Sequence, residues 1–107
     1  MRIQINFGNM ASTDALWDHI TGEVERTLAR HKDRITRVEV HVQDVNARKG
    51  GVDKRVMMEA RPAGLDPIAV EEQSDDVYRA VRSAAEKLET ALSRRFEKLA
   101  DTHGRGA

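Results

Sequence analysis

The hydrophobic and polar positions of this chain alternate with a period of two in several short segments. Residues 2–7 and 35–45 show this alternation clearly, and it predicts strands that bury one face only. Residues 55–61 have the same pattern and predict a third strand, and Ile68 with Val70 predicts a short fourth strand after Pro67. Residues 46–53 are polar and contain Gly50 and Gly51, which predicts a hairpin loop.

Two other segments have the spacing of amphipathic helices. Leu16, Ile20, Val24 and Leu28 recur every four residues, which predicts a helix that Ser12 or Thr13 caps and that ends near His31. The last helix should be capped by Ser74 and end near Asp101, leaving residues 102–107 as a flexible tail. Its apolar stripe consists of Val77, Val81, Ala84, Leu88, Leu92 and Leu99.

The order of these elements is β-α-β-β-β-α, and it predicts one domain over residues 1–101. The helix between the first two strands implies a parallel pair with a right-handed crossover. The remaining strands should follow as an antiparallel meander. We therefore expect an α+β fold, a two-layer α/β sandwich in which a four-stranded mixed sheet carries two helices on one face.

The composition excludes several classes of protein. The 107 residues include no cysteine, which excludes a disulfide framework, a zinc finger and a thiol nucleophile. No segment reaches the roughly 18 apolar residues of a membrane span. The first residues read as a strand and not as a signal peptide. We expect a soluble, cytoplasmic protein with no membrane partner.

The charges are balanced in number but separated along the chain. There are 18 Lys and Arg against 18 Asp and Glu, although nucleic-acid binding usually leaves a basic excess. Residues 26–37 and 48–61 are mainly basic, whereas 66–76 contains only acidic charges. Such a polarised molecule can present a basic face to a polyanion. On the last helix a basic row suited to phosphates or simply to solvent is formed by Lys87, Arg94 and Lys98, with Arg95 adjoining.

No pattern of catalytic residues emerges. The four histidines are dispersed, and neither a zinc-protease helix nor a nucleophile elbow is present. We expect no cofactor, no metal and no small-molecule substrate, although the pairs Glu71-Glu72 and Asp75-Asp76 leave a metal-assisted enzyme as a remote alternative. Trp17 and Tyr78 flank the core stripes, so they are not expected to serve as stacking platforms for bases.

Short motifs across the chain resemble those of one family. The last helix contains Asp75-Asp76-Val77-Tyr78-Arg79-Ala80-Val81, then Lys87-Leu88 and Leu92-Ser93-Arg94-Arg95. Earlier segments are Ile3-Gln4-Ile5, Gly8-Asn9, Asp14-Ala15-Leu16 and Asp33-Arg34-Ile35. Together they are similar to the short ribosome hibernation-promoting factor and ribosome-associated inhibitor family, which includes protein Y and sigma-factor modulation proteins. The family's fold has the same β-α-β-β-β-α order.

The resemblance implies a non-enzymatic bacterial protein that occupies the decoding channel of the small ribosomal subunit and silences or protects ribosomes under stress. It also implies a short form without the second domain of longer members, monomeric off the ribosome. Glu23 and Thr90 stand where the family usually has basic residues. An alternative is a diverged member that binds a basic protein through its acidic patch at residues 66–76. The expected rRNA-binding residues are Arg26, Arg30, Lys32, Lys87, Arg94, Arg95 and Lys98.

Overall fold

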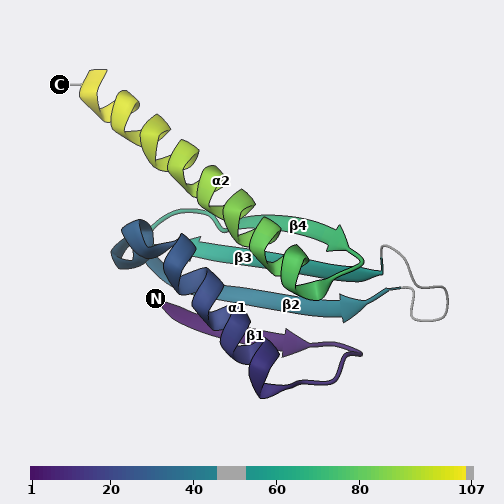
Figure 1. Ribbon diagram of the computed structural model, residues 1–107. Helices are drawn as coiled ribbons and strands as arrows, with labels where there is room; N and C mark the ends of the chain where they lie inside the picture. The colour runs from purple at the N-terminus through teal and green to yellow at the C-terminus, as the bar shows by residue number, and fades with distance from the viewer. Residues whose placement is uncertain (46–52, 106–107) are drawn as a thin grey trace.

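The computed structural model describes the backbone of residues 1–45 and 53–105 and the side chains of these residues up to Ala100. The described residues form four strands, two α-helices and one 3₁₀ helix (Figure 1). In chain order these are β1 (Arg2–Phe7), α1 (Asp14–Thr27), η1 (Ala29–Arg34), β2 (Ile35–Asp44), β3 (Lys54–Pro62), β4 (Ile68–Ser74) and α2 (Val77–Arg105).

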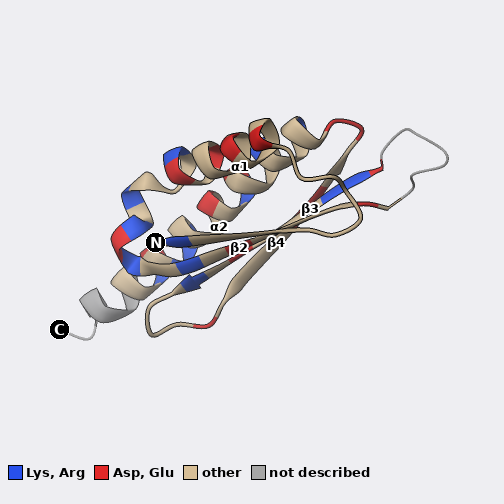
Figure 2. Ribbon diagram, turned by 90° about the horizontal axis from the view of Figure 1, so that it is seen from below, with Lys and Arg blue, Asp and Glu red and all other residues tan. Residues whose placement is uncertain are grey.

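The sheet has the strand order β1-β2-β3-β4. β1 pairs parallel with β2, and β2, β3 and β4 pair antiparallel. Both helices lie on the same face of the sheet, and none of the described elements covers the other face (Figure 2). The predicted α+β fold with a four-stranded mixed sheet is therefore confirmed.

The core lies between the sheet and the two helices. It is built from the apolar positions that the sequence periodicity identifies, because alternate strand residues and every third or fourth helix residue point into the same layer. Each large aliphatic side chain that is fully buried there contributes about 1.5–3 kcal/mol relative to its exposed state. The largest of them are Ile20, Leu28, Met58, Leu88 and Leu92.

The first helix differs from its prediction at its end. Thr13 is the N-cap, and its Oγ1 accepts a hydrogen bond from the amide of Leu16 at 3.1 Å. The helix ends at Thr27, not near His31, because the chain tightens into η1. This 3₁₀ segment turns the chain toward β2 and buries His31. A further turn of α-helix would have a different rise and rotation per residue, and so would place the His31 side chain elsewhere.

The last helix differs from its prediction at both ends. Ser74 is still part of β4, and its Oγ accepts a hydrogen bond from the amide of Asp76 at 3.2 Å. The cap is Asp76, whose Oδ1 accepts from the amide of Tyr78 at 2.9 Å. The backbone stays helical to Arg105 and so passes the predicted end near Asp101, because a single Gly104 costs a helix only about 1 kcal/mol. The predicted tail over 102–107 is therefore helical for its first four residues.

The second helix is longer than the sheet it covers. Its 29 residues correspond to roughly 43 Å of helix, and its C-terminal part extends past the strands (Figure 1). This projection gives the molecule its longest dimension of 57 Å. The predicted hairpin loop lies outside the described residues except for Asp53, which is buried.

Candidate nucleic-acid interface

Basic side chains gather at one end of the molecule, where β1 and β2 begin and β3 ends. η1 leads into β2 at this end, and the C-terminal half of α2 contacts η1 there. Figure 2 shows blue segments of helices and strands coming together at this end, near the N label. We call it the basic end. Its helical side carries Arg26, Arg30, Lys32, Arg34, Arg94, Arg95 and Lys98.

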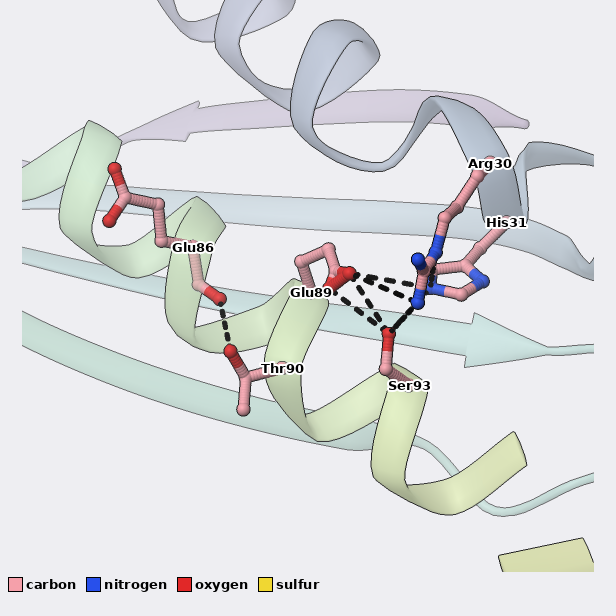
Figure 3. A network of polar contacts seen from close by, with 6 residues as sticks. All are labelled: Arg30, His31, Glu86, Glu89, Thr90 and Ser93. Carbon is pink, nitrogen blue, oxygen red and sulfur yellow. Dashed lines mark hydrogen bonds and ion pairs between the residues drawn. The ribbon is translucent and has the colours of Figure 1, made fainter. Parts of the chain in front are cut away.

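A polar network fixes Arg30 against α2 (Figure 3). The Arg30 Nη2 donates to Ser93 Oγ at 2.8 Å and lies 3.6 Å from Glu89 Oε1. Ser93 Oγ donates to Glu89 Oε1 at 2.9 Å and lies 3.0 Å from His31 Nε2. The Arg30 Nε donates to His31 Nε2 at 3.5 Å, and most of the side chain remains exposed, so terminal N–H groups of the guanidinium stay open to solvent.

His31 is the buried member of this network. Burial lowers its pKa below the ordinary 6.5, and the neighbouring Arg30 and Arg34 lower it further, although Glu89 acts in the opposite direction. Its ring also packs against Phe96, with the ring centroids 5.2 Å apart. The neutral imidazole is thus a structural contact between η1 and α2 that holds the surrounding arginines in place.

The neighbouring cations are positioned in different ways. Arg26 forms an ion pair with Glu23, a buried carboxylate on the same helix that also lies 4.0 Å from Arg82 Nε on α2. Glu23, which stands where the family usually has a basic residue, therefore joins the two helices instead of facing solvent. The guanidinium of Arg34 lies over the Phe96 ring, 3.6 Å from its centroid. Lys32 is exposed on η1.

The predicted row on α2 is divided by the fold. Lys87 donates to the backbone oxygen of Glu71 at 2.9 Å and forms an ion pair with Glu72 at 2.8 Å. It is therefore attached to the middle of β4 and lies away from η1. Arg94 lines the same groove between α2 and β4 further along the helix. The structure thus places Arg94, Arg95 and Lys98 at the basic end, and Lys87 outside it.

Three further arginines belong to the basic end but were not predicted as site residues. Arg2, Arg37 and Arg61 are aligned in the sheet, because Arg2 pairs with Arg37 and Arg37 with Arg61. They line a common depression on the uncovered face. The alternation within β2 places Arg37 on the face opposite the core, but only the strand register shows that the three residues are neighbours.

Two aromatic residues on the helices are exposed. Trp17 is 48% exposed and Tyr78 is 41% exposed, so both present ring surface to solvent. The expectation that these rings do not stack on bases stays a prediction. The Tyr78 ring packs edge-on against His19, with centroids 4.7 Å apart.

The acidic segment forms ion pairs within the protein. Arg55 contacts Glu71 at 2.7 Å and lowers the pKa of this carboxyl group, Glu72 pairs with Lys87, and Asp75 lies 3.6 Å from Arg79. No group of three or more His, Asp or Glu side chains within the described part of the chain could hold a metal ion. None of the helices described here combines the length and hydrophobicity needed to cross a membrane.

Comparison with known proteins identifies the family. Residues 3–100 match the family model described as sigma 54 modulation protein / S30EA ribosomal protein, and the chain belongs to this family. The resemblance seen in the sequence motifs is therefore confirmed. The family's description names a modulation protein and a ribosomal protein and not an enzyme. A comparison with curated proteins gave no match.

Two solved structures share the fold over nearly the whole chain. One is a ribosomal subunit interface protein from Coxiella burnetii, with 25% sequence identity, a TM-score of 0.78, and coverage of 91% of this chain and 99% of that chain. The other is the N-terminal domain of Thermus thermophilus protein Y, with 25% identity, a TM-score of 0.72, and coverage of 88% and 98%.

Proposed function

We propose that this protein binds the small ribosomal subunit in the decoding channel and thereby silences or protects ribosomes under stress. It acts in the cytoplasm, catalyses no reaction, and is a monomer when it is not bound to a ribosome. Membership of the S30EA family supports a ribosome-associated role. The similarity to a ribosomal subunit interface protein and to protein Y supports it further.

The observation that carries the proposal is the separation of charge in a chain of zero net charge. Affinity for RNA depends on the phosphates that a local surface neutralises, so the charge of the whole molecule is a poor guide. The basic end brings together cations from α1, η1 and α2 that are distant in sequence. The ion pairs of Arg30 and Arg26 hold these side chains in place while leaving most of each side chain exposed.

The proposed mechanism is steric exclusion. The rigid sheet and the projecting end of α2 fill space that mRNA and tRNA would otherwise occupy. Arg94, Arg95 and Lys32 contact phosphates of rRNA and fix the orientation of the protein. Because these contacts displace counterions, the affinity should fall with increasing salt.

Binding of a basic protein through the acidic patch is less well supported. Glu71, Glu72 and Asp75 each face a cation from the same chain. A basic partner would have to displace these cations before it gained new ion pairs. Exposed ion pairs contribute only about 0–1 kcal/mol each, so the exchange would yield little affinity.

The test is a comparison of two charge reversals. Arg94→Glu with Arg95→Glu changes the basic end, and Arg55→Glu with Arg79→Glu changes the opposite end by the same net charge. We expect the first variant to lose binding to isolated small subunits at least about tenfold, as expected for removal of several phosphate contacts. The second variant should bind almost as tightly as the wild type.

Equal binding by the two variants would contradict the role of the basic end. Circular dichroism of both variants should show unchanged helix content, since all four residues lie outside the buried core. If the acidic patch were the binding surface, Glu71→Lys with Glu72→Lys would abolish binding while the change at Arg94 and Arg95 had no effect.

A further inference from the structure

The uncovered face of the sheet carries a row of three arginines across three adjacent strands. Arg2, Arg37 and Arg61 are direct register partners in β1, β2 and β3. Neighbouring strands lie about 4.8 Å apart, so the row spans roughly 10 Å of the sheet. Side chains that are directly opposite on one face are close neighbours, and like charges at such positions repel unless an anion lies between them.

The carboxylates nearby satisfy this row only in part. Arg37 Nη2 and Arg61 Nη2 share Glu39 Oε2 at 3.7 and 3.9 Å, which are ion-pair distances and not hydrogen bonds. Arg61 Nε donates to Glu59 Oε1 at 3.3 Å.

One donor of the row is left without a partner among the described residues. Arg37 Nε is buried and has no hydrogen-bond partner within the described part of the chain. Arg2 is exposed at the start of β1. The three guanidinium groups thus keep several N–H donors available around one depression, which Met1 and Thr36 complete.

We propose that this arginine row is a second RNA-binding surface, which takes phosphate groups of an RNA backbone. A planar guanidinium offers paired N–H donors that match two phosphate oxygens. A phosphate between neighbouring arginines would relieve their mutual repulsion and accept hydrogen bonds from their terminal N–H groups. No aromatic ring lies in the row or its depression, so the surface reads the backbone and not the bases.

The arginine row lies on the uncovered face of the basic end, opposite the basic side chains of α1, η1 and α2, which we call the helical cations. Arg37 is three residues beyond the last residue of η1 in sequence, and its side chain points away from the helices. The basic end therefore enters between two RNA segments, an arrangement that extends the proposed function and rests on it. One segment faces the helical cations and the other faces the arginine row. A protein held from both faces is fixed in orientation, whereas a one-sided contact would leave it free to tilt.

The experiment measures binding to isolated small subunits over a series of salt concentrations. The row variant is Arg2→Gln with Arg37→Gln and Arg61→Gln. The matched control is Arg55→Gln with Arg79→Gln and Arg82→Gln, which removes the same charge from the opposite end. We expect the row variant to bind at least about tenfold more weakly. The negative slope of log K against log salt should become shallower by roughly 2–3, or 0.7–0.9 for each lost phosphate contact.

Each outcome has a distinct meaning. If the wild type fails to bind, the proposed function itself fails. If the wild type binds and the row variant matches the control, the arginine row is not a binding surface. A weaker row variant with an unchanged salt slope would mean that the row meets carboxylates of a ribosomal protein, and this too overturns the RNA assignment. Thermal unfolding of each variant detects a folding defect, and Arg37→Lys, which keeps the charge, then provides a milder substitution for the same comparison.

Discussion

The buried histidine between η1 and α2 should make the stability of the protein depend on pH. In the unfolded chain the imidazole of His31 takes up a proton near the ordinary pKa of 6.5, whereas burial in the folded protein lowers that pKa. Between the two values the unfolded state binds more protons than the folded state. The free energy of unfolding must therefore fall as the pH decreases below about 6.5.

The size of this effect has an upper limit. A difference of one bound proton changes the free energy of unfolding by at most about 1.4 kcal/mol per pH unit. Between pH 6.5 and pH 5.5 the loss assigned to His31 is therefore no more than about 1.4 kcal/mol. Glu89 raises the pKa of His31, so Glu89→Gln should lower it further and extend the pH dependence to more acidic conditions.

Urea unfolding at several pH values between 7.5 and 5.5 measures the effect. The wild type should lose more stability toward pH 5.5 than His31→Gln, which removes the titrating group and keeps a hydrogen-bond donor near Ser93. An NMR titration of the imidazole should show a midpoint below 6.5. Identical pH profiles of the two proteins would refute the reasoning. A wild type that gains stability in acid relative to the variant would show that the charge of Glu89 dominates over burial.

Three further substitutions test the local structure. Asp76→Ala removes the cap of α2 and should lower the free energy of unfolding by about 0.5–2 kcal/mol in urea titrations, more than Ser74→Ala, whereas the reverse order would contradict the assigned cap. Leu88→Ala truncates a fully buried core residue and should cost about 2–5 kcal/mol, lowering Tm in calorimetry by at least about 8 °C; a smaller change would mean a looser core. Arg34→Met keeps contact with Phe96 but removes the charge over its ring, so chemical unfolding should show a loss of about 0.5–1 kcal/mol, and an unchanged stability would show that the cation contributes nothing.

The sequence predicts the layers of this fold well because hydrophobic periodicity follows burial directly. The alternation in residues 35–45 identifies Val38, Val40 and Val42, and all three are buried. Element ends are predicted less well, because they depend on local hydrogen bonds. The choice between Ser74 and Asp76 as a cap is decided by how far β4 continues, and strand length depends on its pairing with β3.

The candidate site was predictable only in part. Periodicity places Lys87 and Arg94 on one side of the last helix, and both line the groove beside β4. It does not show that the carboxylate of Glu72 holds Lys87, since that contact joins two elements. The alignment of Arg2 with Arg37 likewise depends on the register of a parallel pair, which the two strand patterns leave open.

The most direct test of the proposed function is co-sedimentation of the purified protein with isolated small and large ribosomal subunits at low and moderate salt. We expect stoichiometric binding to the small subunit, weakened by salt, and much weaker binding to the large subunit. Absence of binding to the small subunit at low salt, or equal binding to both subunits, would contradict the proposal.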